Sequence, residues 1–329
     1  MARPSLRSSA TPDQIRLTTR VASLYYEHGH GQVQIAEQLG ITQTRVSRLL
    51  KQAEQLGIVK ITVHVPAGVH AGLEQALEQR YGLDEVIVVE VPDVESLSNE
   101  QLNQVLATPV AAYLELMLPG FRSVGVSSWS SALLAAVNQM RPCSPGETQR
   151  IVQVVGGLGM ASAQVFATRL TERLAELTRS EAVFMLAPGV IGTLEAKAAM
   201  LTDPACRQAL ERFDDLSALL MGVGAIPPSR MLRESGNVFS DQDLADLQAA
   251  GAVGDVCMRF YDAQGKHLAT PFDERVLGIG ADQILRTRRR IGVAGGPRKF
   301  EGIRGALRGR WVTTLITDLA TAERLEAEP

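Results

Sequence analysis

Six polar side chains between residues 43 and 51 could bind the base edges and phosphates of double-stranded DNA. They are Gln43, Thr44, Arg45, Ser47, Arg48 and Lys51. Gln and Arg form paired hydrogen bonds with adenine and guanine, whereas Thr, Ser and Lys suit phosphate oxygens. Their spacing around Val46 and Leu49 places them on the outward face of one helix. The segment is therefore a candidate DNA-recognition helix.

Glycines and hydroxyls form a second candidate site, one that would bind a small anionic effector. Four such stretches follow predicted strands, at residues 127–131, 156–159, 222–224 and 295–299. Free backbone N–H groups at the start of a helix, hydroxyls and a lysine together suit a phosphate group. The candidate effector contacts are Ser127, Ser128, Ser130, Gly156, Gly157, Leu158, Gly159, Gly222, Gly224, Asp255 and Lys299. An ordinary turn remains the alternative for each glycine cluster, and a turn cap is the alternative for Asp255.

The recognition face needs a helix-turn-helix to hold it. Helical spacing of apolar residues begins after Pro12, a second short helix is predicted over 32–39, and Gly40 permits a sharp turn. Thr42 is a plausible N-cap for a third helix that runs to about Leu56. Apolar residues fall where two helices that cross at a steep angle bury side chains, at Ile35, Leu39, Ile41, Val46 and Leu49. The alternative is an ordinary three-helix surface with solvated charges.

A domain boundary is expected near Pro66. Residues 58–65 alternate apolar and polar side chains, which predicts a strand that is either a wing on the helices or a connector. The sequence Pro66-Ala67-Gly68 then closes the segment. We therefore predict a DNA-binding domain over 1–65 and an effector-binding and oligomerisation domain over 66–329.

The effector site needs a parallel sheet, since ligands bind outside the carboxyl ends of parallel strands. Strands are predicted at 85–91, 123–126, 151–155, 182–186, 218–223, 253–261, 291–294 and 312–316. Helices are predicted near 71–81, 99–118, 129–140, 162–178, 193–200, 204–212, 240–249, 281–287, 297–308 and 318–327. This alternation predicts a mostly parallel, doubly wound α/β domain.

Composition and charge favour a DNA-binding head on a globular body. The chain has 329 residues, 45% of them apolar and 21% charged. Residues 1–65 hold eight basic and four acidic side chains, which leaves 25 basic and 32 acidic side chains in the rest. A basic head on an acidic body is expected when only the head contacts DNA phosphates.

Several other classes of protein are not favoured. No apolar run reaches the roughly 18 residues of a membrane helix, and the amino terminus lacks the apolar stretch of a signal peptide. Three scattered cysteines, Cys143, Cys206 and Cys257, suit a reducing cytoplasm better than a disulfide framework or a zinc site. Neither a dinucleotide fingerprint nor a phosphate loop is present, so no cofactor and no metal are expected.

The chain resembles the SorC family of bacterial sugar-responsive transcriptional regulators over nearly its whole length. The stretches 32–41 and 45–50 look like that family's helix-turn-helix. Residues 251–256 and 259–262 are similar to its central effector-domain motif. Four further stretches of this chain resemble the family's carboxyl-terminal signature: residues 294–299, 303–309, 315–318 and 320–322.

The resemblance implies an effector domain folded like ribose-5-phosphate isomerase and glucosamine-6-phosphate deaminase, used for sensing. It also implies a phosphorylated sugar as effector, a homotetramer on DNA, and effector contacts at the 156–159 loop, Asp255 and Lys299. The chain departs from the family where Trp129 is followed by Ser130-Ser131-Ala132, because the family has Trp-Gly-x-Thr there. That departure puts the shape of this subsite in question.

The function expected is that of a repressor or activator whose operator affinity is controlled by an effector. One alternative is a sugar-phosphate isomerase or deaminase with a DNA-binding appendage, in which Asp255 is the only candidate base. A second alternative is a constitutive DNA-binding scaffold whose pocket binds no effector. Tyr113, Leu114 and residues 116–118 could supply an oligomer interface or part of the core.

Overall fold

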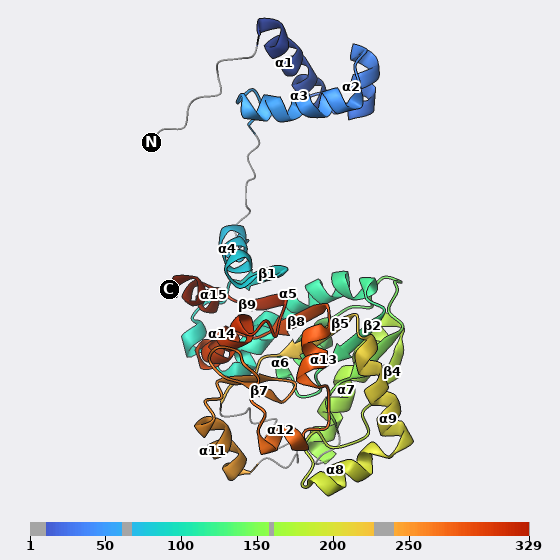
Figure 1. The fold of residues 1–329 in the computed structure, drawn as a ribbon, viewed down its shortest axis with the longest axis vertical. Coiled ribbons are helices and arrows are strands. Elements are labelled where there is room, and N and C mark those ends of the chain that lie inside the picture. Colours follow the sequence, from blue (N-terminus) through green and yellow to red (C-terminus); the bar gives the residue numbers. More distant parts are fainter. Residues whose placement is uncertain (1–10, 61–67, 158–160, 227–239, 329) are drawn as a thin grey trace. The chain divides into compact units, whose positions relative to one another are not determined.

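The computed structural model describes residues 11–60, 68–157, 161–226 and 240–328. The chain divides into two compact units, residues 1–66 and 67–329. Figure 1 shows the helices and strands of both units, and each unit has its own hydrophobic core.

The amino-terminal unit, called the head below, contains three helices: α1 (Pro12–Tyr26), α2 (Gln32–Leu39) and α3 (Gln43–Gln55). Thr11 caps α1, and Thr42 caps α3 by accepting a hydrogen bond from the Arg45 backbone N–H. Gly40 ends α2 in the left-handed conformation, which glycine adopts without steric cost. The head core contains Val21, Ile35, Ala36, Val46, Leu49 and Leu50. The helix-turn-helix prediction is confirmed, whereas residues 58–60 form no strand, and 61–65 of the predicted strand lie outside the described residues.

The carboxyl-terminal unit, called the body below, contains one seven-stranded sheet in which every neighbouring pair is parallel. The order is β1 (Glu85–Val89), β9 (Thr314–Asp318), β8 (Arg289–Val293), β5 (Ala218–Gly222), β2 (Ser123–Val126), β3 (Arg150–Gln153) and β4 (Glu181–Val183). Four strands precede the glycine and hydroxyl clusters, and they are neighbours in this order: β8, β5, β2 and β3. This arrangement brings their carboxyl ends to one edge.

Helices cover both faces of this sheet. The body helices are α4 (Ala71–Tyr81), α5 (Asn99–Met117), α6 (Ser131–Gln139), α7 (Ala161–Thr178), α8 (Leu194–Leu201), α9 (Pro204–Glu211), α11 (Asp241–Ala249), α12 (Pro271–Arg275), α13 (Ala281–Arg286), α14 (Phe300–Arg308) and α15 (Leu319–Ala327). One core lies between α5, α6, α7 and the sheet, and the other lies between the opposite sheet face and helices that include α4, α14 and α15. Alternate residues of β5 point to the two cores, Leu220 to the first and Leu219 to the second. The fold is thus doubly wound, as predicted.

The predicted strand over 253–261 was wrong as a sheet strand. The structure places an antiparallel hairpin there, with strands β6 (Gly254–Val256) and β7 (Arg259–Tyr261) outside the main sheet. Cys257 and Met258 form its turn with φ values of 50° and 62°. Two successive residues in the left-handed region reverse the chain, and neither residue type predicts that conformation.

Candidate functional site

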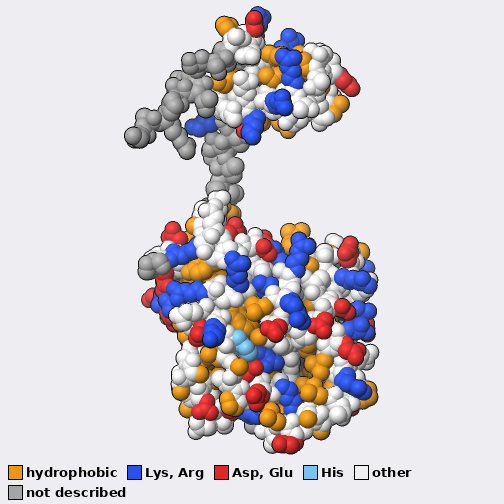
Figure 2. All heavy atoms as spheres, viewed as in Figure 1, with side chains coloured by type: hydrophobic (Ala, Val, Ile, Leu, Met, Phe, Trp, Pro, Cys, Tyr) orange, Lys and Arg blue, Asp and Glu red, His pale blue; other side chains and the backbone are white. Residues whose placement is uncertain are grey.

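The six predicted DNA-contacting side chains all lie exposed on α3. Gln43, Thr44, Arg45, Ser47, Arg48 and Lys51 are exposed. Val46, Leu49, Leu50 and Ala53 on the same helix are buried. The helix therefore presents one polar, basic face and packs its apolar face into the head core. On the face of the body drawn in Figure 2, basic and acidic side chains are interspersed.

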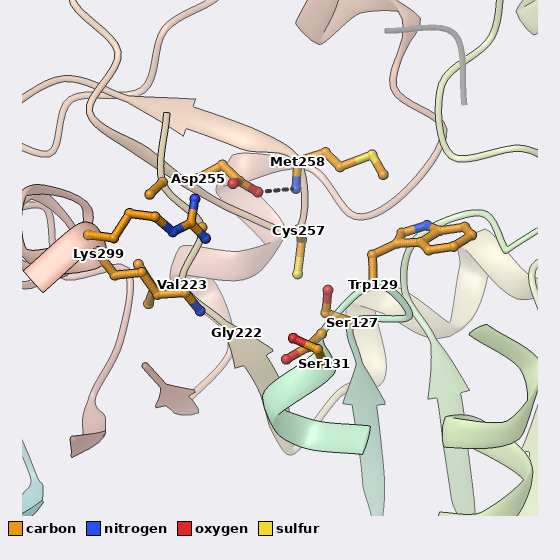
Figure 3. Close-up of a pocket in the computed structure, with 13 residues that line it drawn as sticks. Ser127, Trp129, Ser131, Gly222, Val223, Asp255, Cys257, Met258 and Lys299 are labelled. Carbon is orange, nitrogen blue, oxygen red and sulfur yellow. Dashed lines mark hydrogen bonds between the residues drawn. The ribbon is translucent and has the colours of Figure 1, made fainter. Parts of the chain in front are cut away.

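A pocket lies at the carboxyl ends of β2, β5 and β8, the position expected for a ligand in an open parallel sheet (Figure 3). Its lining residues are Ser127, Trp129, Ser130, Ser131, Gly222, Val223, Gly224, Ala225, Asp255, Cys257, Met258, Arg298 and Lys299. The structure thus brings six of the predicted effector contacts together: Ser127, Ser130, Gly222, Gly224, Asp255 and Lys299.

The hairpin carries Asp255 to this pocket. Its Oδ2 accepts a hydrogen bond of 3.1 Å from the Met258 backbone N–H across the turn. The carboxylate lies against Gly224, where an added Cβ would come within 1.8 Å of Oδ1. Arg259, the next residue after the turn, is buried and donates to the Ile279 carbonyl and to Asp273, which anchors the hairpin.

Burial raises the pKa of Asp255 to about 6, although the Met258 N–H and the positive charge of Lys299 both act to lower it. Because the side chain is only partly exposed to solvent, its charged form is poorly hydrated. A ligand hydroxyl that donates to this carboxylate would replace part of the lost hydration.

Lys299 reaches the pocket from the end of β8. It ends a short 3-10 turn, Pro297–Lys299, that follows Gly296 with φ 84°. The Gly296 N–H donates to buried Asp318 Oδ2 at 2.7 Å and to Thr321 at 3.1 Å, so the loop is held from the neighbouring strand β9. Burial and the nearby Arg298 charge lower the pKa of Lys299 to about 8, against the effect of Asp255.

Three predicted contacts lie beside the pocket and do not line it. Ser128 is buried and donates its hydroxyl to the Val155 carbonyl at 2.9 Å. Gly156 packs against the backbone of Pro188, where a Cβ would lie 2.3 Å from the carbonyl oxygen, and Gly157 bridges to the same residue. Leu158 and Gly159 lie outside the described residues.

The predicted 127–131 stretch also contributes Ser131 and Trp129 to the lining, whereas Cys257 and Met258 were not predicted to line the pocket. Ser131 accepts a hydrogen bond of 2.9 Å from Asn103 Nδ2 on α5, and Trp129 donates to the Gly156 carbonyl at 3.0 Å. Cys257 and Met258 line the pocket from the hairpin turn. The apolar run over 253–261 predicted one continuous strand and gave no sign of this turn. Arg298 was weighed as an alternative to Lys299 for the phosphate contact, and both line the pocket.

Within the described ranges, no group of three His, Cys, Asp or Glu side chains is placed to hold a metal ion. Among the helices that the structure describes, none combines the length and apolarity that crossing a bilayer requires.

Comparison with known proteins agrees with both halves of this arrangement. Residues 66–325 match the family described as "Putative sugar-binding domain", and residues 19–55 match sigma-70 region 4. The sorbitol operon regulator of Klebsiella pneumoniae is 31% identical over 317 residues, 95% of this chain and 98% of that one. The deoxyribonucleoside regulator of Bacillus subtilis is 30% identical over 94% of this chain and 97% of its own length.

Solved structures give the same result. The crystal structure of the full-length sorbitol operon regulator SorC from Klebsiella pneumoniae superposes with a TM-score of 0.69 at 29% identity, covering 95% of this chain and 99% of that chain. A domain described as that of "a possible sugar-binding transcriptional regulator" from Arthrobacter aurescens gives a TM-score of 0.70 at 25% identity, over 80% of this chain and all of its own length.

A helix-turn-helix head and a sugar-binding α/β body define the class of DNA-binding transcriptional regulators that respond to a sugar effector. Within that class, the chain belongs to the SorC family. Its relatives are named as regulators, so it is a regulator and not an enzyme, and the isomerase or deaminase alternative is set aside.

Proposed function

We propose that this regulator binds a phosphorylated sugar in the pocket at the carboxyl ends of β2, β5 and β8, and that binding changes its affinity for operator DNA. Arg45 and Arg48 on α3 read base edges in the major groove, while Ser47 and Lys51 contact the phosphate backbone. The protein acts in the cytoplasm as a homotetramer. Effector and operator binding are coupled by about 1–3 kcal/mol, the usual range for allosteric proteins.

The free ammonium of Lys299 is the observation that carries this proposal. Among the described residues its ammonium makes no hydrogen bond or ion pair, and it lines the pocket together with Asp255. A half-buried cation without a partner is costly unless an anion completes its coordination. A phosphate group supplies that anion.

Asp255 and the serine hydroxyls form the part of the pocket that binds the sugar hydroxyls. Lys299 holds the phosphate, whereas Asp255 accepts hydrogen bonds from sugar hydroxyls. Ser127, Ser130 and Ser131 both donate and accept, which suits a polyol. The proposed contacts are therefore Ser127, Ser130, Ser131, Gly222, Gly224, Asp255 and Lys299, with Ser128, Gly156 and Gly157 supporting the pocket wall.

A calorimetric titration tests the assignment. Ribose-5-phosphate, glucosamine-6-phosphate and their free sugars are titrated into the parent chain, Lys299→Ala and Asp255→Asn. Loss of Lys299 is expected to weaken the phosphorylated ligand at least tenfold and to change the free sugar little. Loss of Asp255 is expected to weaken both forms.

Lys266→Ala serves as the matched control, because Lys266 is exposed and lies outside the pocket lining. It should bind like the parent. If Lys299→Ala binds a phosphorylated ligand as tightly as the parent does, the phosphate site lies elsewhere, and the 127–131 turn is the next candidate.

A further inference from the structure

A second concave site lies at the opposite edge of the same sheet. Its lining includes the residues that precede or begin β1, β9, β8, β5 and β2, five neighbouring strands. The lining residues are Gly82, Asp84, Met117, Gly120, Phe121, Ser217, Arg288, Arg289, Arg290, Arg310, Val312 and Thr313. We call this the amino-edge pocket. Because the strands are parallel, it is separated from the effector pocket by the length of a strand, about 16 Å for five residues.

The amino-edge pocket has an excess of positive charge. Four arginines line it, whereas Asp84 is the only acidic lining residue. Arg288 and Arg310 are exposed, and their guanidinium groups make no hydrogen bond or ion pair with any described residue. Some other arginines of the body are paired, as Arg286 is with Asp214 at 3.1 Å and Arg304 with Glu328 at 2.7 Å.

Arg290 adds a buried charge that forms no ion pair with a carboxylate among the described residues, although the charge of Asp84 acts on it. It is 8% exposed, and its guanidinium donates only to the backbone carbonyls of Leu285, Thr287 and Arg310. Its Nε has no partner, and burial lowers its pKa. A buried cation bonded only to neutral groups is stabilised by an anion placed nearby.

Arg289 does not offset this excess. Its guanidinium pairs with Glu85 and with Asp84 at 3.5 Å, and it donates to the Tyr113 hydroxyl at 2.9 Å. The one acidic residue of the lining is thereby already engaged. The unpaired charges of Arg288, Arg290 and Arg310 therefore remain available to an incoming anion.

The shape of the amino-edge pocket suits a small ligand. Gly82 ends α4 with φ 65°, and a Cβ there would lie 3.2 Å from Arg310 Nη2, so the glycine makes room for that guanidinium. Arg310 itself has φ 55°, a left-handed conformation that is rare for a residue with a side chain. Met117, Phe121 and Val312 give the lining an apolar part. The pocket combines guanidinium forks, which fit phosphate oxygens, with an apolar wall.

We propose that the amino-edge pocket is a second ligand site, distinct from the effector pocket, which binds a small organic phosphate through Arg288 and Arg310. Arg290 contributes its charge from behind, and Met117 and Phe121 contact the organic part of the ligand. The regulator thereby senses a second anionic metabolite on the same sheet.

Calorimetric titration with inorganic pyrophosphate tests this proposal on the full chain. The background variant is Lys299→Ala, which removes the lysine from the other pocket. Pyrophosphate is expected to bind this variant, and the added pair Arg288→Gln and Arg310→Gln is expected to weaken it at least tenfold. Arg207→Gln in the same background is the matched control, because Arg207 is an exposed arginine on α9 outside this pocket, and it should leave binding unchanged.

Three results would overturn the proposal. They are no measurable binding of pyrophosphate to Lys299→Ala, equal binding with and without the Arg288 and Arg310 changes, or a loss of operator affinity without a loss of pyrophosphate binding. The last would make the surface a DNA contact. Both arginines are exposed, so their replacement is expected to leave the fold intact. Thermal unfolding of each variant verifies that it folds. Failure here leaves the Lys299 test of the effector pocket unaffected, because that test compares sugar phosphates with free sugars.

Discussion

Asp255 and Lys299 are opposite charges whose pKa values burial moves toward each other, to about 6 and about 8. Neither group is used as a base in a regulator. Their value is that both stay charged in a partly desolvated pocket over a narrow range of pH, where each can form a charge-assisted hydrogen bond with a ligand.

Affinity for a phosphorylated sugar is therefore expected to be greatest between pH 6 and 8. Below about 6, Asp255 takes up a proton and loses its charge as an acceptor, and the phosphate also begins to protonate, with a pKa of about 6. Above about 8, Lys299 loses its proton and its attraction for phosphate. Calorimetry from pH 5 to 10 measures this profile.

The alkaline limb is the cleaner test with ribose-5-phosphate, because that ligand does not titrate there. Lys299→Arg should abolish that limb, since a guanidinium stays charged. An alkaline limb that persists unchanged in Lys299→Arg would show that another group titrates.

Asn103 is expected to act as a positioning residue for Ser131. Its amide donates to Ser131 Oγ at 2.9 Å, so the serine proton is left to donate into the pocket. Asn103→Ala should weaken binding of a phosphorylated sugar by about 0.5–1.5 kcal/mol, the usual net value of one hydrogen bond. Thr108→Val is the control, because Thr108 joins the same helices through Gln139 away from the pocket. Equal losses in both variants would mean that only the helix packing matters.

At the scale of elements, α3 carries the DNA-binding prediction. Arg48→Ala should weaken specific operator binding by about 1–3 kcal/mol if the side chain reads a base. Lys51→Ala should weaken all sequences alike and reduce the salt dependence by about one unit. Fluorescence titrations at several salt concentrations distinguish the two effects.

Arg20→Ala on α1 provides a comparison with an exposed arginine outside the recognition helix. If Arg48→Ala and Lys51→Ala both bind operator as the parent does, the recognition face has been assigned to the wrong helix surface.

Elements set by local signals could be predicted from the sequence. The caps and the turn at Gly40 fix the head helices, and apolar runs identified all seven sheet strands. The hairpin was mistaken for one strand because Cys257 and Met258 occupy left-handed conformations that their types do not favour. The helix over Pro271–Arg275 was missed because five residues are too few for a periodic signal.

The effector pocket could be predicted only in part. Strand ends identified Ser127, Gly222 and Lys299, because the carboxyl ends of neighbouring parallel strands meet. Long-range packing decided the rest: the Ser128 hydroxyl is taken by the Val155 carbonyl, and Asn103 comes from a distant helix. The spacing of residues along the chain predicts neither of these contacts.

At the scale of the whole molecule, the proposed assembly is symmetric. Paired heads on a twofold axis require operator half-sites about 34–36 Å apart, or a multiple of that spacing. Of the residues considered for an interface, Tyr113, Leu114 and Leu118 belong to the core, whereas Leu116 is 78% exposed. Sedimentation should give four chains, and footprinting should give paired half-sites. A monomer that protects a single half-site would contradict the assembly.

The most direct test of the account is an operator titration of the parent and Lys299→Ala, each with and without the sugar phosphate that binds the parent most tightly in calorimetry. The account predicts that the sugar phosphate shifts the parent's operator affinity about 5–150-fold, the range that a coupling of 1–3 kcal/mol gives. Lys299→Ala should bind operator like the ligand-free parent and show no shift, since the lysine lies in the body. An unchanged shift in Lys299→Ala, or no shift in the parent, would contradict the account.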